Sequence, residues 1–207
     1  MPACAGMTGG LVCCIEEESW KNLQKLLNDR CLFLRLGLAA WLLLAACAAQ
    51  AAGSLHGTVV GVADGDTVTV LDARKKRHKI RLQGIDAPEL RQAFGRKSKQ
   101  SLSGLVFGKQ VKVVLQQRDR YGRWLGKVMV ADPGCRAARC PLTLDAGHAQ
   151  LTRGLAWWYR TYAREQGAAD AAAYQWAEQE ARARRAGLWQ TAKPTPPWAW
   201  RRKHAPS

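Results

Sequence analysis

Acidic residues are scarce in this chain of 207 residues, where 16 Asp and Glu stand against 32 Lys and Arg and the formal net charge is +16. So basic a surface attracts polyanions, with nucleic acid the first candidate and an anionic membrane surface the second. Residues 1–47 hold four residues of each sign, so the rest of the chain has 28 basic and only 12 acidic residues. The place of each of those acids is therefore informative.

A long apolar run is also lacking. The run from Leu36 to Ala46 is shorter than the roughly 20 residues of a membrane span. Arg30 and Arg35 precede it and small residues follow, which is typical of a secretory signal peptide. Residues 1–51 are interpreted as a leader, and residues 1–29 as a start assigned too far upstream. The protein is therefore expected to be exported, either periplasmic or secreted.

The end of the leader allows two kinds of processing. Ala49–Ala51 offers a cleavage site before Ala52, whereas Leu44–Cys47 resembles a bacterial lipobox that would leave Cys47 lipidated and anchor the protein to a membrane. A buried core helix is a third interpretation, which the flanking arginines and alanines disfavour.

Cysteine is nearly absent after the leader, which leaves only Cys135 and Cys140. In an oxidising compartment this pair predicts a disulfide that closes a small loop. A zinc site is the alternative, but His148 has no second ligand at a suitable spacing.

The composition excludes a disordered or collagen-like chain, because 47% of the residues are hydrophobic and nine are tryptophan. No internal repeat is apparent. Alternating apolar residues predict five short strands, with a turn signal at Asp64–Asp66 between the first two. Five strands interrupted by a helix are typical of an OB-type barrel, so an α+β fold is expected. The expected strands are 57–62, 67–71, 78–83, 110–115 and 125–130.

About three helices are expected, at residues 92–107, 143–153 and 168–186, where glycine follows each. Residues 191–207 are rich in Pro, Trp and Arg, and are expected to form an extended tail whose tryptophans dock on the domain.

Two carboxylates, Asp86 and Glu89, lie three residues apart around a turn stiffened by Pro88. Calcium prefers several oxygen ligands, from carboxylates, carbonyls and water. Asp66, which also stands beside a strand end, could meet Asp86 at one rim of a barrel. On its own the turn at Asp64 needs no function, since Asp-Gly is a common hairpin signal.

A third polar segment, Asp119–Arg123, lies between two expected strands. Alone it fits a solvated loop. Phosphodiester hydrolysis, however, needs a metal, a group that activates or orients water, and cations where negative charge develops. The acids and arginines of the three segments together fill these roles.

Taken together, these segments resemble the staphylococcal nuclease (thermonuclease) family over residues 55–190. The order and spacing of five blocks agree with that family. The blocks are Asp64–Thr67, Arg81–Glu89, Asp119–Arg123, Arg153–Ala156 and Gly187–Trp189.

The resemblance implies a calcium-dependent nuclease that acts on DNA and RNA, single-stranded or locally opened, with an OB-fold barrel and three helices. It implies a site built from metal ligands, catalytic groups and nucleotide-binding groups. The implied metal ligands are Asp66, Asp86 and the backbone carbonyl of Ala87; the implied catalytic residues are Arg81, Glu89 and Arg123; the implied substrate-binding residues are Arg120, Tyr121 and Tyr162.

Two departures from the family's best-known member stand out. Ala87 replaces a threonine, which a carbonyl ligand should tolerate, and only Leu90–Ala93 separates Glu89 from the first helix, so a flexible loop is largely missing. Aromatic residues 157–162 could stack on bases or pack in the domain; Tyr162 is expected toward the cleft and most of the others in packing.

Two other functions remain open. A catalytically inactive OB-fold module that binds nucleic acid would be expected to lack some of the five charged site residues, all of which this chain has. An envelope lipoprotein would use the basic charge for adhesion, but leaves the clustered acids unexplained. A monomer is the default expectation.

Overall fold

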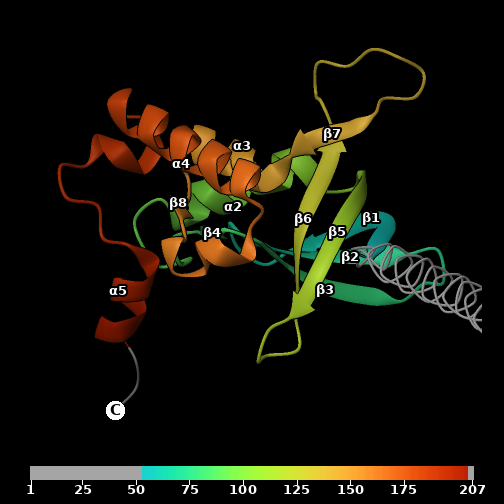
Figure 1. Ribbon diagram of the computed structural model, residues 1–207, viewed down its shortest axis with the longest axis horizontal. Helices are drawn as coiled ribbons and strands as arrows, with labels where there is room; N and C mark the ends of the chain where they lie inside the picture. Colours follow the sequence, from blue (N-terminus) through green and yellow to red (C-terminus); the bar gives the residue numbers. More distant parts are fainter. Residues whose placement is uncertain (1–52, 205–207) are drawn as a thin grey trace, which may run out of the picture. The chain divides into compact units, whose positions relative to one another are not determined.

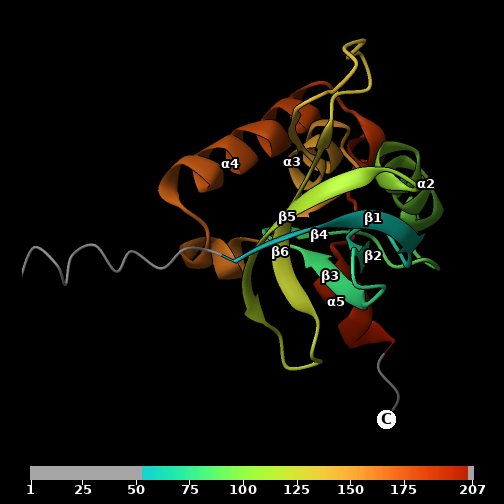
Figure 2. The ribbon, with the colours of Figure 1, turned by 90° about the vertical axis from the view of Figure 1, so that its right-hand side faces the viewer.

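The computed structural model describes residues 53–204, in which a β-barrel is covered on one side by helices (Figures 1 and 2). Three strands form an antiparallel meander, β5 and β6 follow, and β3 pairs with β6 in parallel to close the barrel. The five-stranded OB-type barrel predicted from the sequence is confirmed. Its strands are β1 (Ser54–Val62), β2 (Thr67–Asp72), β3 (Arg77–Leu82), β5 (Gln110–Arg118) and β6 (Trp124–Ala131).

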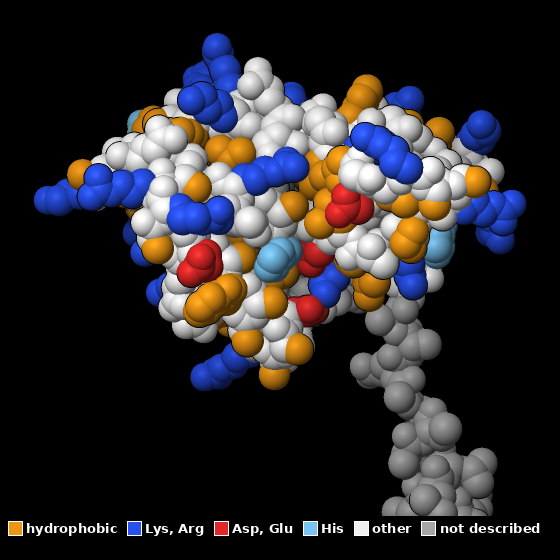
Figure 3. All heavy atoms as spheres, turned by 90° about the horizontal axis from the view of Figure 1, so that it is seen from above, with side chains coloured by type: hydrophobic (Ala, Val, Ile, Leu, Met, Phe, Trp, Pro, Cys, Tyr) orange, Lys and Arg blue, Asp and Glu red, His pale blue; other side chains and the backbone are white. Residues whose placement is uncertain are grey.

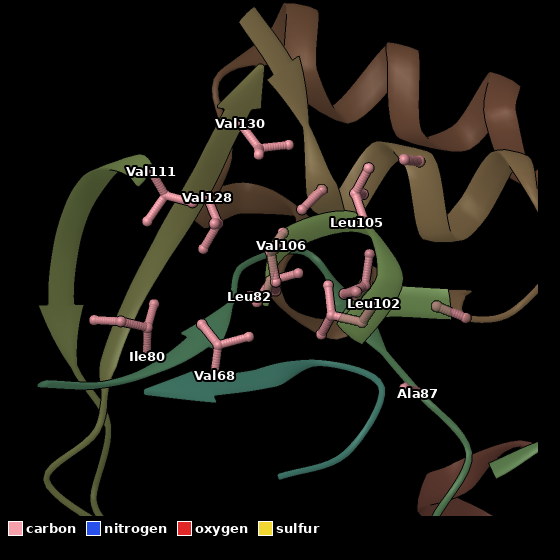
Figure 4. Close-up of a cluster of buried hydrophobic side chains, with 14 of the residues drawn as sticks. Val68, Ile80, Leu82, Ala87, Leu102, Leu105, Val106, Val111, Val128 and Val130 are labelled. Atoms are coloured by element: carbon pink, nitrogen blue, oxygen red, sulfur yellow. The ribbon is translucent and has the colours of Figure 1, made fainter. Parts of the chain in front are cut away.

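The barrel core comes from the alternation of side chains along these strands, because successive residues of a strand point to opposite faces. Val68 and Val70 of β2, and Val128 and Val130 of β6, are fully buried. Figure 4 shows Val68, Val128 and Val130 with Ile80 of β3, which points into the same interior.

Helices pack on the open side of this core. The helix α2 contributes the buried Leu102, Leu105 and Val106, whose side chains meet those of the barrel in Figure 4. The helices expected at 92–107 and 168–186 are confirmed with shorter bounds. The helical segments are α2 (Gly95–Val106), α3 (Ala146–Thr152), η1 (Arg160–Glu165), α4 (Ala168–Ala183), η2 (Gly187–Gln190) and α5 (Pro197–Lys203).

The helix expected at 143–153 begins later than predicted. Leu142–Asp145 forms β7, which extends the sheet beside β6, and α3 starts at Ala146. The Asp145 carboxylate caps α3 by accepting hydrogen bonds from the amides of Gly147 and His148. The cap residue therefore fixes where strand becomes helix.

Two short strands, β4 (Ile85–Asp86) and β8 (Trp157–Trp158), form a second small sheet that the sequence did not predict. Ile85 pairs with Trp158 and Asp86 with Trp157, and all four residues are buried. This sheet ties the segment that follows β3 to the C-terminal half of the domain.

The β6–β7 connection projects from the barrel (Figure 1), and a disulfide joins Cys135 to Cys140 within it. The predicted disulfide is thus present and the zinc alternative is wrong, since both thiols are used.

The tail differs from the extended form that was expected. Residues 197–203 form the helix α5, with Pro197 in its first turn, where a missing N–H costs nothing. The predicted docking of the tryptophans is confirmed for Trp198, which stacks on Tyr159 with 5.6 Å between ring centroids and meets Trp157 edge-on at 6.4 Å.

The leader expected at residues 1–51, including Cys47, lies outside the described residues. Within residues 53–204 no helix has the length and apolar character needed to cross a membrane.

Candidate active site

Asp66 comes directly before β2, at a barrel rim, and three hydrogen bonds to its neighbours hold it. The Thr67 hydroxyl donates to Oδ1 at 2.9 Å, and the Ala87 amide donates to Oδ2 at 2.9 Å. Asp64 accepts from the Asp66 amide at 3.0 Å, which fixes the turn. The Asp66 carboxylate is therefore buried in a fixed orientation.

Arg81 links the first two acids. The β2–β3 register places Arg81 opposite Thr67, beside Asp66. Its Nη1 donates to Asp66 Oδ1 at 2.8 Å and its Nη2 to Asp86 Oδ1 at 2.7 Å. The sequence prediction that Asp66 and Asp86 meet at one rim is borne out by this shared guanidinium.

A second arginine, which the sequence reasoning missed, joins Asp86 to Glu89. Arg201 of α5 donates to Asp86 Oδ2 at 2.8 Å, to Asp86 Oδ1 at 3.2 Å and to Glu89 Oε1 at 2.9 Å. It lies 115 residues from Asp86 in the chain, so no local spacing could have revealed the contact. Its only sequence signal is the basic Trp/Arg-rich composition of the tail.

Burial and charge act on these groups in opposite directions. Desolvation raises the pKa of Asp66, and the nearby Arg81 offsets only part of that effect. Burial likewise opposes the charge of Arg81, but Asp66 and Asp86 outweigh it and raise the pKa of the guanidinium. Desolvation lowers the pKa of Arg201, but its hydrogen bonds to Asp86 and Glu89 outweigh this effect, so the pKa is raised. Both arginines therefore stay cationic.

Arg123 occupies the β5–β6 turn, where its guanidinium pairs with Asp119 at 2.7 Å. In the parallel pairing of β3 with β6, Leu125 lies opposite Arg81. Arg123 precedes Leu125 by two residues, which is about 7 Å along an extended chain. Among the described residues Arg123 makes no ion pair with Asp66, Asp86 or Glu89.

The expected nucleotide-binding groups are accessible. Tyr121 is 68% exposed, with the guanidiniums of Arg120 and Arg123 over its ring at 4.9 and 5.4 Å. Tyr162 is 47% exposed and meets Tyr159 edge-on at 5.0 Å. Both tyrosine rings are therefore exposed to solvent, whereas Trp157 and Trp158 are buried in packing as expected.

An open pocket of about 590 Å³ lies between the Glu89 segment and α5. Asp64 and Glu89 line one part, and Trp200, Arg201 and His204 the other. Glu89 is thus the acid of the site that solvent reaches, with 39% of its side chain exposed, while Asp86 is fully buried. On the face drawn in Figure 3, acidic side chains are few among the spread of Lys and Arg.

Residues 53–204 contain no group of three or more acidic, His or Cys side chains already arranged around a metal. Carboxylate oxygens are nevertheless the ligands that calcium prefers, and the Arg201 guanidinium lies between the carboxylates of Asp86 and Glu89. The residues present fit a hard cation, provided Arg201 gives way. At Ala87, whose carbonyl was expected to bind the metal, the structure shows a hydrogen bond from the backbone amide to the Asp66 carboxylate.

The comparisons agree with this geometry. The profile of the staphylococcal nuclease homologue family matches residues 79–191. The chain belongs to the staphylococcal nuclease family. The segment matched runs from β3 through η2, so it includes Arg81, Asp86, Glu89 and Arg123.

Several relatives of this staphylococcal nuclease homologue match over most of their length. The Protein ParB of Escherichia coli is 42% identical over 171 residues, which cover 83% of this chain and 93% of the relative. The Micrococcal nuclease of Shigella flexneri is 39% identical over 177 residues, which cover 82% of this chain and 92% of the relative. An Uncharacterized endonuclease of Escherichia coli O157:H7 is 40% identical over 149 residues, which cover 72% of this chain and 86% of the relative.

Proposed function

We propose that this nuclease hydrolyses phosphodiester bonds of DNA and RNA with calcium, at the site where Asp66, Arg81, Asp86 and Glu89 meet. Its family and its endonuclease-named relatives make it a metal-dependent endonuclease-type hydrolase. The observation that carries the residue assignment is Arg81, whose single guanidinium joins Asp66 to Asp86 at hydrogen-bond distance.

Asp66, Asp86 and the Ala87 carbonyl would hold the metal. Calcium, when bound, supplies positive charge that neutralises a phosphate oxygen and lowers the barrier to attack by water. The two aspartates suit ligation because they are buried and fixed by hydrogen bonds.

Glu89 has a different role. Because its carboxylate faces the open pocket, it can accept a hydrogen bond from a water molecule and orient or deprotonate it for attack on phosphorus. The carboxylates of Asp66 and Asp86 are buried and not exposed to solvent water. Burial therefore assigns these two residues as metal ligands and Glu89 as the base.

Arg81 and Arg123 would stabilise the phosphate as negative charge grows on its oxygens in the transition state. For this, some N–H donors of the Arg81 guanidinium would have to point toward a phosphate while others stay hydrogen-bonded to the aspartates. Arg123 would exchange its pair with Asp119 for the substrate, and its turn is open to solvent on the Tyr121 side.

Little sequence preference is expected, because contacts to phosphate carry no base information. Arg120, Tyr121 and Tyr162 would bind the nucleotide, with the exposed rings stacking on any base at about 1–3 kcal/mol each. Stacking requires unpaired bases, so single-stranded or locally opened substrates are favoured.

Export is part of the proposal. The Cys135–Cys140 disulfide supports it, since disulfides persist mainly in oxidising compartments. The signal-like residues before Ala52 agree. The mature protein would be a periplasmic or secreted monomer, or one anchored through a lipidated Cys47.

The alternative is an inactive OB-fold module that binds nucleic acid. All five charged positions are present in the sequence. Arg81 joins Asp66 to Asp86 by hydrogen bonds, and Arg201 joins Asp86 to Glu89. A module without catalysis has no need of this arrangement. The alternative of an adhesive envelope lipoprotein leaves it unexplained as well.

The test is an assay of the mature protein, from residue 52, on heat-denatured DNA with calcium or with a chelator. Nucleotides should be released only with calcium, and Glu89→Gln should lower the rate about 10²–10⁴-fold, the usual contribution of a general base. Arg202→Gln, at an exposed position of α5, is the matched control and should keep the wild-type rate. Undiminished hydrolysis by Glu89→Gln would show that another site cleaves the substrate.

A further inference from the structure

Arg201 occupies the oxygens that the proposed metal site requires. Asp86 Oδ2 accepts from Arg201, and Asp86 Oδ1 accepts from both Arg81 and Arg201. Arg201 also binds Glu89 Oε1. A cation that ligates Asp86 must therefore displace at least one arginine from its carboxylate.

Of the two arginines, Arg201 is the one that can leave. The side chain of Arg81 is 15% exposed and lies between two acids that are themselves buried. The side chain of Arg201 is 42% exposed and lines the open pocket. Water can hydrate the Arg201 guanidinium as it withdraws, whereas Arg81 would have to leave both of its partners inside the protein.

The helix that carries Arg201 is itself held in place. Trp198 packs on Tyr159 and Trp157, and the Gln92 side-chain amide binds the Thr195 carbonyl just before the helix. These contacts do not involve Arg201, so its side chain can move while α5 stays docked.

We infer that Arg201 is a positioning residue that competes with the metal: it holds Asp86 and Glu89 in the metal-free enzyme and exchanges with calcium when the metal binds. This inference rests on the proposed function, since it needs calcium to bind at Asp86. It makes the C-terminal helix part of the active site. In the metal-free protein the guanidinium keeps two neighbouring carboxylates paired, and the need to break these pairs lowers the affinity of the protein for calcium.

The test is the affinity for calcium, measured by titration calorimetry on the mature protein. Arg201→Gln should bind calcium about tenfold more tightly, equivalent to about 1.4 kcal/mol, because no pair must be broken first. The matched control, Arg202→Gln, should leave the affinity unchanged, as Arg202 makes no ion pair among the described residues. Equal or weaker binding by Arg201→Gln would overturn the inference, because a merely structural ion pair predicts no tightening.

Thermal unfolding provides a second readout that does not depend on activity. Without calcium, Arg201→Gln should unfold at a lower temperature than wild type, because Asp86 and Glu89 lose a partner. Saturating calcium should then raise its midpoint more than it raises that of wild type, since a ligand that binds the folded state more tightly stabilises it more. A smaller calcium-induced rise in Arg201→Gln would count against the exchange.

The wild-type protein allows a test that no folding defect can confound. The guanidinium resonance of Arg201, assigned by its loss in Arg201→Lys, should shift in NMR spectra as calcium is added. The indole N–H resonance of Trp198 should stay near its metal-free position. An Arg201 signal that does not respond at saturating calcium would contradict the exchange.

Asp86→Asn separates this inference from the proposed function. The proposed function requires that Asp86→Asn lose both calcium binding and hydrolysis, and retained hydrolysis would contradict it. If Asp86→Asn is inactive but Arg201→Gln binds calcium with wild-type affinity, the proposed function stands and the role of Arg201 fails.

Discussion

At the scale of single residues, Arg81 joins stability to chemistry. Its guanidinium forms ion pairs with two buried aspartates, and removing one partner of a buried ion pair typically costs about 3–5 kcal/mol. Complete truncation would therefore confuse loss of fold with loss of catalysis, and a substitution that keeps the charge is more informative.

Arg81→Lys tests the fork geometry of that guanidinium. An ammonium is a point charge that cannot bind Asp66, Asp86 and a phosphate with fixed, parallel donors. The rate on denatured DNA should fall about 10²–10³-fold, as when a single transition-state donor is removed. Circular dichroism should show an unchanged fold, and near-wild-type hydrolysis would mean that charge alone suffices at this position.

Gly65 has a packing role besides its place in the predicted turn between β1 and β2. Asp-Gly predicts a turn glycine, yet Gly65 is not among the residues with positive φ. A Cβ at this position would meet the Ser98 side chain and Ala87, so the glycine is needed for close packing beneath Asp66.

Gly65→Ala should therefore destabilise the protein by about 1–3 kcal/mol, the usual cost of overpacking, and displace the neighbouring Asp66. Chemical denaturation measures the first effect and calcium titration the second. Gly104→Ala, where a Cβ meets nothing within 4 Å, is the control. Equal stability in the two variants would contradict the packing explanation.

At the scale of elements, the start of α3 depends on a carboxylate with several partners. Asp145 caps the helix and accepts a 2.8 Å hydrogen bond from the Tyr174 hydroxyl of α4. Burial and the nearby Asp145 raise the pKa of Tyr174 well above its ordinary value. The neutral phenol is therefore favoured by folding.

Tyr174→Phe should lower the free energy of unfolding by about 2 kcal/mol, the range for a hydrogen bond to a charged group. The sign of the pH dependence follows from the raised pKa: the folded protein retains the proton longer, so this stabilisation is complete below about pH 10 and is lost above it. Urea unfolding of both proteins between pH 7 and 11 measures the difference. An advantage of wild type that grows above pH 10 would contradict it.

The elements that the sequence predicted share a simple cause. Alternation and turn signals located all five barrel strands because each strand buries one face locally, as Val68 and Val70 do. The pairs β4–β8 and β6–β7 were missed because two to four residues carry no periodic pattern, and their pairing is decided by distant partners such as Trp157 and Trp158. The tail was expected to be extended because of its prolines, but Pro194 and Pro196 lie before the helix and Pro197 lies in its first turn, where proline is tolerated.

At the scale of the whole molecule, the positive charge predicts salt-dependent binding. Three phosphate contacts to a single strand would give a slope of log affinity against log salt of about −2, at about −0.7 per contact. Glu89→Gln, with calcium present, should show this slope by fluorescence anisotropy on single-stranded DNA. Adding Arg120→Gln should reduce its magnitude by about 0.7, and an unchanged slope would remove Arg120 from the binding surface.

The site could be predicted as far as it is built from the segment between Asp66 and Glu89, where strand ends and turns place neighbouring groups together. The meeting of Asp66 and Asp86 followed from that logic and is present, and the structure adds that the Arg81 guanidinium joins them. Arg201 could not be predicted, because docking of α5 depends on Trp198 finding Tyr159 and Trp157 across the fold. The sequence predicted that the tail tryptophans dock on the domain, but not which residues they contact.

The position of His204 beside the pocket affects how the enzyme should be produced. His204 lines the same pocket as Glu89 and Arg201, so a polyhistidine tag fused shortly after α5 would add metal-chelating imidazoles near these residues. An affinity tag at the amino end of the mature chain, removed before assay, avoids an artefact that could be mistaken for altered metal requirement.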